Sequence, residues 1–413
     1  MRYRASVELN SALLVGDRRE PTGFFLVSRS FISGAVLRAG IAREITLACP
    51  LAPADGSHWV RYMGVNACME CTWRNLCRDF DRIRFGHCYP EGARVAPMTA
   101  YRCKANPSHR ICDSLLESER TVCPECKGGM ERFSGFVDTE WREVNPTRRL
   151  VMRLAVDPYR HVASEGRLYA LRILEPGQRF TGWVETPDET ELDIPVRMCV
   201  HLGAKISSGL GRATLCLEMV TEDVVQGIKK RCAHLTAIAD QAATNRVAMN
   251  LAATNQSGMN QTATGQGYFS LTLLSDALPY VSLPLLGEGY QETSVLRERL
   301  ARAILPEKFW NTVNPVTERV VADFRFYGGY QTTGVNAGRR HGRTYIAAGS
   351  VFLFRVPGGL SDTLINELVE LERTGIGLCT EDGYGSVRVC DEFHLQKEGE
   401  INGVHYKPTG FPS

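Results

Sequence analysis

The chain has 413 residues, 44% of them hydrophobic and 23% charged, with a formal net charge of +2. This length supports two or three domains with a sizeable core, and the composition is that of a globular protein. The near-neutral charge excludes a protein that is basic overall, so any anion site must be local. The N-terminus has no apolar run of signal-peptide length, and no stretch approaches the ~18 apolar residues of a membrane span; we therefore expect a cytoplasmic protein without a membrane partner.

The first predicted elements are a strand and a helix. Alternating apolar residues predict a strand over residues 3–15, which Gly16 ends. Ser33 is expected to cap a helix that contains Gly34 and Arg38. A helix whose first turn carries Ser and Gly leaves backbone amides free for an anion, so these three residues are candidates to bind an anion such as a phosphate of RNA. The alternative is an ordinary β–α unit.

A cysteine-rich insertion follows at about residues 49–136, where the hydrophobic periodicity fades. Eight of the 14 cysteines fall between Cys68 and Cys126. In a reducing compartment such a cluster indicates metal binding rather than disulfides. Two C-x2-C pairs, Cys68 with Cys71 and Cys123 with Cys126, would place four thiolates around a structural Zn²⁺ with no open coordination position.

Other ligand sets are compatible with the same window. A rival single site consists of Cys103, His109 or Cys112, Cys123 and Cys126. A second metal ion is a further alternative. An iron–sulfur cluster uses the same residue types, and reduced buried cysteines are the alternative without metal, which explains two C-x2-C pairs poorly.

A glycine pattern occurs twice, after further strand-like runs at 149–156, 166–174 and 180–185. Each copy reads glycine, five residues, glycine, an apolar residue and glycine, and a strand-like run follows. We name residues 203–211 the first glycine loop and residues 377–385 the second glycine loop. Neither has the Lys of a Walker loop or the G-x-G-x-x-G of a dinucleotide site.

The glycine loops expose backbone amides that suit the phosphates of a single RNA strand; the alternative is a pair of tight turns. Their candidate RNA-binding residues are Lys205, Gly209, Gly211, Arg212, Gly383 and Gly385. Glu381 and Asp382 lie inside the second loop, whereas the first is basic. We expect the first loop to hold phosphates more strongly, with a protein neighbour as the alternative partner of the second.

The connector and the second half come next. Residues 221–266 begin as a helix and then become rich in Ala, Asn, Thr and Gln, which predicts a helical or flexible connector with little to bury. The second half shows strands at 268–274, 320–326 and 345–356, a helix at 293–304, and a helix capped by Ser361.

A glycine-rich basic loop is predicted between the strands at 320–326 and 345–356. It carries Arg339 and Arg340, which are candidate RNA-binding residues, with Tyr327 and Tyr330 available for stacking. The alternative is a solvated charged loop. No metalloprotease motif or nucleophile elbow is present, so no catalytic residue is assigned.

Together the elements favour an α+β fold without regular βαβ alternation. Each half reads as strands with helices on one face, ending in helix, glycine loop and strand, which predicts two ferredoxin-like modules of the RNA-recognition-motif type. The expected boundaries are 1–220 for the first module with its insertion, 221–266 for the connector and 267–413 for the second module.

These motifs resemble the RAMP superfamily of CRISPR-associated proteins over nearly the whole chain. The strand before Gly16 and the segment FISGAVLRAG are similar to the family's strand and Ile-Pro-Gly-Ser-x-Leu-Arg-Gly helix, with Ser33 in place of Pro and Ala39 in place of Gly. Both glycine loops match the family's G-rich loop. Within the family the chain resembles the subtype III-D effector subunits, in which a cysteine-bearing insertion is expected.

The resemblance implies a non-catalytic subunit at the foot of a type III CRISPR effector complex in antiviral defence. It would cap the 5′ repeat-derived handle of the CRISPR RNA, beside the large polymerase-like subunit and the backbone RAMP subunits, with target RNA contacted indirectly. One alternative is a metal-independent endoribonuclease that processes precursor CRISPR RNA with His161 or His201 as general base. Another is a metal-structured protein-interaction module without RNA contact.

Overall fold

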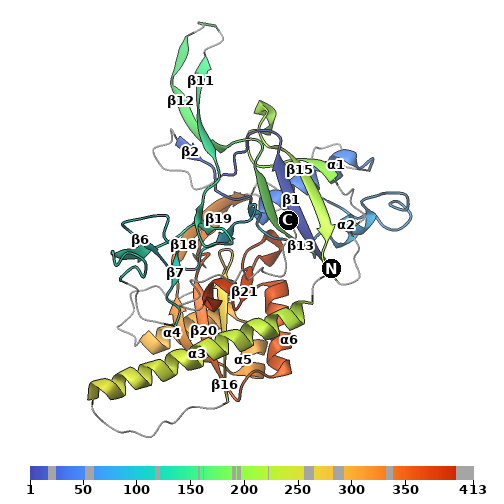
Figure 1. Cartoon of the computed structure of the whole chain (residues 1–413). Helices are drawn as coiled ribbons and strands as arrows, with labels where there is room; N and C mark the ends of the chain where they lie inside the picture. The colour runs from blue at the N-terminus through green and yellow to red at the C-terminus, as the bar shows by residue number, and fades with distance from the viewer. Residues whose placement is uncertain are drawn as a thin grey trace.

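The computed structural model describes twelve stretches of the chain, and the fold is given for them: residues 1–16, 25–51, 60–116, 121–156, 159–160, 162–187, 192, 197–221, 223–254, 265–281, 293–331 and 338–396. Two main sheets stand one above the other in Figure 1, and a long helix crosses the lower one. No helix in these stretches combines the length and the apolar character needed to cross a membrane.

The upper sheet belongs to the first half and has the strand order β14-β15-β1-β13-β3, with β4 also paired to β13. Its strands are β1 (Arg2–Leu9), β3 (Arg84–Phe85), β4 (Tyr89–Pro90), β13 (Arg179–Glu185), β14 (Arg197–His201) and β15 (Arg212–Met219). Helix α1 (Gly34–Ala48) buries Leu37 and Ile41 in the same core as Val7 and Phe180. All the β-pairings in this sheet are antiparallel.

The lower sheet belongs to the second half and has the order β17-β20-β16-β21. Its strands are β16 (Gln266–Leu273), β17 (Val316–Val321), β20 (Val351–Pro357) and β21 (Val387–Val389), and its helices are α4 (Thr293–Ile304), α5 (Glu307–Val313) and α6 (Asp362–Thr374). Apart from the short α5, β16-α4-β17-β20-α6-β21 is the β-α-β-β-α-β arrangement, with the first and third strands central.

The first half departs from the predicted ending of helix, glycine loop and strand. Its loop joins two antiparallel strands, β14 and β15, whereas the loop of the second half follows α6. The reason lies in the residue pattern of β14. Met198 and Val200 are buried and their neighbours are more exposed, which is the period of two that a strand shows.

The prediction that the connector at residues 221–266 has little to bury was wrong. Residues 224–254 form one helix, α3 (Val224–Thr254), which lies across the lower sheet in Figure 1. Ile228, Cys232 and Leu235 are fully buried in the core of the second half. They stand four and three residues apart, so they line one face of the helix, and the polar residues between them occupy the other faces.

Two long hairpins lie outside the two main sheets. The first consists of β11 (Arg148–Val156) and β12 (Ala163–Leu174), with β2 (Phe25–Val27) parallel to β12, and it projects from the top of the molecule in Figure 1. The second consists of β18 (Phe324–Gln331) and β19 (Gly338–Ile346). Most of the predicted glycine-rich loop at 327–343 is therefore strand, because the pairing of β18 with β19 continues as far as Gln331 and Gly338.

Apart from β3 and β4, the cysteine-rich insertion and the residues after it as far as Val144 form short elements outside the upper sheet. These are α2 (Arg74–Asp79), β5 (Arg94–Val95), β6 (Ala100–Cys103), β7 (Cys112–Asp113), β8 (Met130–Arg132), β9 (Phe136–Val137) and β10 (Glu143–Val144). The part that contains β6 and β7 contacts the second half of the chain. Arg319 of β17 donates to the carbonyl oxygens of Ser114 and Leu115 at 2.6 and 2.8 Å, and Leu115 is buried in the second core.

A buried histidine joins the insertion to the second half. His394 Nδ1 lies 2.9 Å from Asp113 Oδ2, and its Nε2 lies 2.9 Å from the Thr272 hydroxyl. Burial lowers the pKa of His394, but the Asp113 carboxylate, with Asp391 and Cys390 adding to its effect, outweighs burial and leaves that pKa above its ordinary value. The folded state therefore binds this proton more tightly than the unfolded chain does.

The His394–Asp113 pair predicts a pH dependence of stability. Its contribution is fully present below the unfolded histidine pKa of about 6.5 and is lost as pH rises through the higher folded pKa. We expect the free energy of unfolding, from urea titrations between about pH 6 and about pH 9, to fall more for the wild type than for Asp113→Asn. Parallel declines would show that the pair does not stabilise the protonated form.

Candidate metal centre and nucleic-acid interface

The metal centre is built around a turn that Cys123 begins. The amide of Cys123 donates to Gly128 O at 2.8 Å, and the amide of Lys127 donates to Cys123 O at 2.9 Å. Lys127 has a φ of 61°, which closes the turn, and the Gly128 amide donates to Cys126 Sγ at 3.4 Å. An amide that points at a sulfur stabilises it as a thiolate, the form that binds metal.

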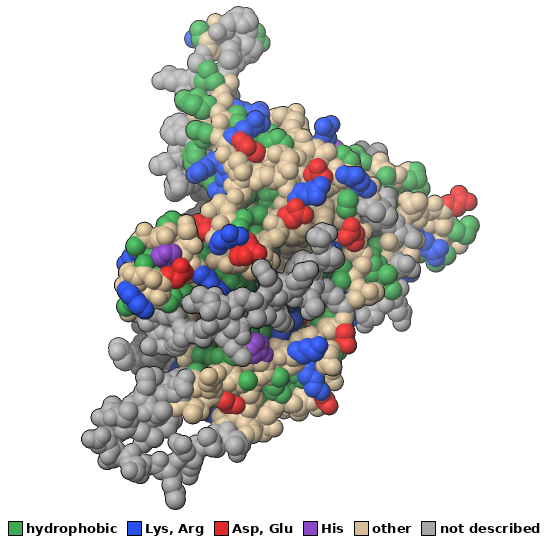
Figure 2. Space-filling model, in the orientation of Figure 1, with side chains coloured by type: hydrophobic (Ala, Val, Ile, Leu, Met, Phe, Trp, Pro, Cys, Tyr) green, Lys and Arg blue, Asp and Glu red, His purple; other side chains and the backbone are tan. Residues whose placement is uncertain are grey.

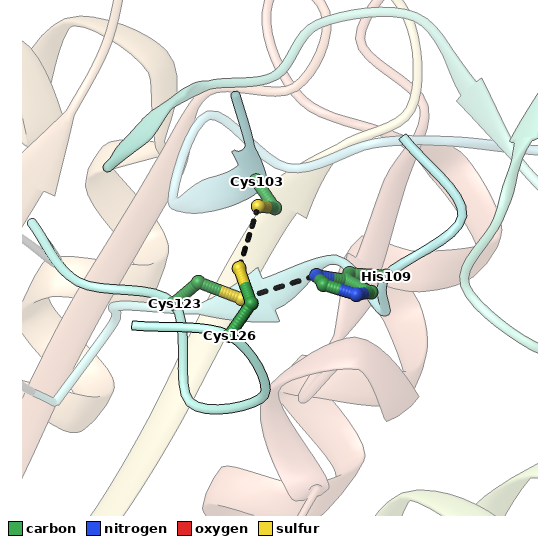
Figure 3. A group of neighbouring side chains, drawn as sticks. All are labelled: Cys103, His109, Cys123 and Cys126. Carbon is green, nitrogen blue, oxygen red and sulfur yellow. Dashed lines mark hydrogen bonds between the residues drawn. The ribbon is translucent and has the colours of Figure 1, made fainter. Parts of the chain in front are cut away.

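Two further donors meet this turn (Figure 3). Strand β6 ends at Cys103, whose Sγ lies 3.5 Å from Cys126 Sγ, and His109 Nδ1 lies 3.5 Å from Cys123 Sγ. All four ligand atoms lie within 4.8 Å of one another. A tetrahedral Zn²⁺ with Zn–S bonds of about 2.3 Å separates its ligand atoms by roughly 3.8 Å, so this group fits the ion.

The metal-ligand prediction is corrected by this geometry. Cys123 and Cys126 take Cys103 and His109 as partners, which is the rival set, and Cys68 and Cys71 lie outside the group. Cys112, the alternative to His109, donates to a carbonyl oxygen at 3.6 Å. Sequence spacing identifies the donors, but the pairing of β6 with β8 decides which distant cysteine reaches the turn.

A carboxylate lies behind the imidazole of His109. His109 Nε2 faces Glu125 Oε2 at 3.8 Å, so Nδ1 is left for the metal. A carboxylate behind a ligating histidine fixes its orientation and raises its basicity. Three cysteines and one histidine would complete the coordination of the ion, which predicts a structural role.

The two glycine loops share one backbone conformation. Four residues in each loop have positive φ at equivalent positions: Gly203, Lys205, Gly209 and Gly211 in the first, and Gly377, Cys379, Gly383 and Gly385 in the second. The amide after each loop donates to a serine hydroxyl, Arg212 to Ser11 at 2.9 Å and Ser386 to Ser275 at 2.8 Å. The repeated sequence pattern is therefore also a repeated structure.

The second glycine loop packs against the first half of the chain. Asp382 Oδ1 accepts from Arg38 of α1 at 3.2 Å, and Thr380 O accepts from Arg84 of β3 at 3.2 Å. A Cβ on Gly383 would lie 2.5 Å from His87 Nδ1, so the loop backbone fills this contact closely. The protein neighbour of the second loop is thus the first half of the same chain.

The first glycine loop is exposed in contrast. Lys205, Gly209 and Arg212 are exposed, and no described atom lies within 4 Å of a Cβ placed on Gly209. Lys205 Nζ lies 5.6 Å from the centre of the Tyr169 ring. The predicted exposed amides are mostly bonded within the protein, since Gly209 N donates to Ile206 O at 2.9 Å and Gly211 N to Ala12 O at 2.8 Å. The two exposed cationic side chains are what suits a phosphate-bearing strand.

Alanine variants at equivalent glycines of the two loops test whether only the second loop is packed against protein. Gly209 and Gly383 have φ values of 81° and 86°, so alanine carries a similar backbone cost of roughly 1–2 kcal/mol at either position. Only Gly383→Ala adds a clash, because its Cβ would lie 2.6 Å from Phe85 O. We expect Gly383→Ala to lower the free energy of unfolding in urea by about 1–3 kcal/mol more than Gly209→Ala does. Equal losses would contradict the packing of the second loop.

The predicted anion site at the start of α1 has protein partners. Gly34 N donates to His87 Nδ1 at 3.1 Å, and a Cβ on Gly34 would lie 1.8 Å from Phe85 O. Ser33 is buried and makes no side-chain cap bond, and Arg38 also pairs with Asp81 at 3.1 Å. Contact of Ser33, Gly34 and Arg38 with RNA stays a prediction.

The remaining predicted residues lie on β19, in the second glycine loop, or outside the part of the chain that the structure describes. Arg339 and Arg340 are on β19, opposite Tyr330 and Gly329, and their side chains fall outside the described part of the structure. His161 also falls outside it. RNA contact by the two arginines and by Gly383 and Gly385 stays a prediction.

A buried ion network near the second loop was not predicted. Glu372 of α6 accepts from Arg231 of α3 at 2.8 Å and from Arg388 of β21 at 2.7 Å, and Arg388 also pairs with Glu392. Burial lowers the pKa of Arg388, and the carboxylates of Glu372 and Glu392 more than reverse the effect. Arg388 therefore stabilises the junction of α3, α6 and β21.

Charged side chains are interspersed rather than segregated on the face shown in Figure 2. Lys and Arg alternate with Asp and Glu there, in keeping with the net charge of +2. An anion site must therefore come from local geometry, as the exposed first glycine loop provides.

Comparisons with known proteins gave structural similarities alone. No family model and no curated protein match the sequence. A chain of a type III-B Cmr-beta structure bound to cognate target RNA is 11% identical, with a TM-score of 0.37, 85% of this chain covered and 86% of that one. A chain of a type IV-B CRISPR complex is 12% identical, with a TM-score of 0.27 and coverages of 54% and 92%. The crystal structure of Cmr4 is 10% identical, with a TM-score of 0.24 and coverages of 54% and 100%.

Proposed function

We propose that this chain is a non-catalytic, RNA-binding subunit of a type III CRISPR effector complex. In subtype III-D it would be the subunit of the Csx group, member ten, that caps the 5′ repeat-derived handle of the CRISPR RNA. The observation that carries the proposal is the contrast between the glycine loops. One backbone conformation occurs twice; the second copy is packed against protein, and the first is exposed and basic.

The first loop has the features of a phosphate site. Lys205 and Arg212 flank the open backbone of Gly209, and His201 stands opposite Arg212 in the pairing of β14 with β15. Cations hold phosphates without reading bases, which suits a handle of constant sequence bound by its shape. The resemblance of this loop to the G-rich loop of the RAMP superfamily supports RNA as the ligand.

The projecting hairpin supports a place in an assembly. Leu150, Met152 and Leu154 alternate along β11 and are 58%, 63% and 49% exposed, and Leu168 stands opposite Leu154 on β12. They form an apolar face on the hairpin at the top of Figures 1 and 2. Exposed apolar faces mark protein contacts, and the large polymerase-like subunit and the backbone RAMP subunits are the proposed partners.

An RNA assay tests the proposal. The purified chain is incubated with labelled repeat-derived handle RNA and with a scrambled RNA of equal length. We expect tight, salt-sensitive binding of the handle RNA and no cleavage. Absence of binding to either RNA would overturn the RNA-binding role and favour the interaction module.

A second candidate function is precursor CRISPR RNA cleavage by an endoribonuclease. His201 Nδ1 lies 3.0 Å from Glu44 Oε1, and a carboxylate that orients a histidine is an arrangement used in general base catalysis. Attack by a ribose 2′-OH would leave a 2′,3′-cyclic phosphate. Such products, lost in His201→Ala while RNA binding persists, would establish the nuclease over the non-catalytic role.

A further inference from the structure

One face of the upper sheet points away from the core that α1 joins. Buried and half-buried residues alternate along β1 and β13. Residues that alternate in this way lie on opposite faces of a strand. The half-buried set, which defines what we name the outer face, includes Arg2, Arg4, Ser6, Thr181 and Trp183.

The strand order places Trp183 at the centre of the outer face. Apart from the edge strand β14, the order is β15-β1-β13-β3, so the first and third of these four strands lie side by side. Trp183 on β13 stands opposite Arg4 on β1. In RNA-recognition motifs, aromatic side chains on a four-stranded sheet stack on bases. Trp183 therefore occupies a position at which such a sheet can stack a base.

Two arginines accompany the indole. The guanidinium carbon of Arg2 lies 4.0 Å from the centre of the Trp183 ring, and that of Arg4 lies 6.0 Å from it. Glu185 Oε1 lies 3.4 Å from Arg2 Nε, and the Arg2 side chain keeps 25% of its surface exposed. Arg2 and Trp183 thus form a cation–π pair that fixes both planes. Because bases stack on aromatic rings and on guanidinium planes, the pair offers both kinds of surface.

Arginines outnumber glutamates on the outer face. Glu8 has two arginine partners, Arg179 and Arg197, each 3.7 Å away. The other charged residues of this face on β1, β13 and β15 are Arg2, Arg4 and Arg212 against Glu185 and Glu218. The excess of positive charge complements the phosphates of RNA.

The outer face continues from the first glycine loop. Arg212 ends that loop and begins β15, and it lies on the same face as Glu218, six residues further along the strand. Glu218 and Trp183 stand on either side of Arg4. The path from Arg212 to Trp183 is therefore roughly 20 Å long. A short single strand whose phosphates contact Arg212 can reach Trp183 with one of its bases.

We propose that Trp183, with Arg2 stacked on it, binds a nucleobase of the RNA strand whose phosphates the first glycine loop holds. The inference rests on the proposed RNA-binding role and adds a base contact to it. Every base has a π-face, so stacking accepts any base at this position. The loop would hold the backbone of the strand, and the sheet would fix the orientation of one base.

Filter binding of labelled handle RNA to the full chain tests this contact. We expect Trp183→Ala to weaken binding about tenfold, because one base–aromatic stack is lost, and Trp183→Phe, which keeps a ring, to lose less. The slope of log K against log salt should stay at the wild-type value in both, since stacking neutralises no phosphate. Wild-type affinity of Trp183→Ala, or equal losses in the two variants, would overturn the base contact alone. Absence of binding by the wild type would overturn the RNA-binding role itself.

Two further measurements do not depend on the folding of a variant. Handle RNAs that lack the base of one nucleotide at a time keep every phosphate, and we expect one such position to weaken binding to the wild type about tenfold. Ultraviolet irradiation of the wild-type complex should attach a nucleotide to the peptide that contains Trp183, identified by mass spectrometry. Equal binding of all the abasic RNAs, or bound RNA without an adduct on this peptide, would contradict the stack.

Discussion

Chelation of the metal held by Cys103, His109, Cys123 and Cys126 is expected to unfold the small sheet of β6, β7 and β8. The apolar clusters at this sheet are small. One consists of Tyr101, Cys103, Cys123 and Met130, with Cys112 packed against it, and the other joins Ala100 of β6 to six residues that include Ile111 and Phe133. So small a core cannot offset the conformational entropy of the strands without a further link. Structural zinc contributes apparent binding energies of about 10–16 kcal/mol in zinc-finger peptides, so its removal should outweigh any single side-chain change.

Hydrogen–deuterium exchange measures this effect segment by segment. We expect the amides of β6 and β8 to lose most of their protection in a strong chelator or in Cys123→Ser/Cys126→Ser. The amides of β16, buried in the second core, serve as the internal reference and should change little. Protection of β6 and β8 that survives complete metal removal would show that packing alone holds the sheet.

Loss of Lys205 and Arg212 is expected to have the largest effect on RNA binding. Both side chains are exposed beside the open backbone of the first glycine loop. Each charge-assisted phosphate contact contributes on the order of 1.5 kcal/mol, so each should lower the affinity for handle RNA roughly tenfold. The slope of log K against log salt should become shallower by about 1.4, because each phosphate contact on a single strand adds about 0.7.

A control variant that also removes two positive charges, but away from the first glycine loop, shows whether the loss of affinity is specific to that loop. Lys229→Ala/Arg302→Ala removes two exposed cations whose partners are Asp362 and Glu298, on helices away from the first loop. Filter binding at several salt concentrations should give a wild-type slope for this control. If both double variants weaken binding equally, net charge rather than the first loop holds the RNA.

Local signals in the sequence predicted local structure well. The apolar stripe at 293–304 gave the bounds of α4, and Ser361 caps α6 by accepting from the Leu364 amide at 3.2 Å. Caps and helical periodicity depend on residues within a few positions of one another, so they can be read directly. The glycine pattern likewise predicted a duplicated loop, because positive φ values demand glycine at most of the same positions.

The errors concern contacts between distant segments. The buried stripe of α3 was missed because Ile228, Cys232 and Leu235 stand among polar residues and meet their partners only in the folded sheet. The metal partner Cys103 depends on strand pairing, and the packing of the second loop depends on how the halves meet. The charge of Asp382 was the one available hint, since it pairs with Arg38, 344 residues away.

Site-specific photocrosslinking tests most directly whether the first glycine loop holds the handle. A photoreactive amino acid replaces exposed Ser208 in the first loop or Glu381 in the second, and each protein is irradiated with CRISPR RNA bound. We predict crosslinks from position 208 to nucleotides of the 5′ handle, mapped by mass spectrometry, and few from position 381. Handle crosslinks from position 381 alone, or none from position 208 in a complex that binds RNA, would contradict the proposed interface.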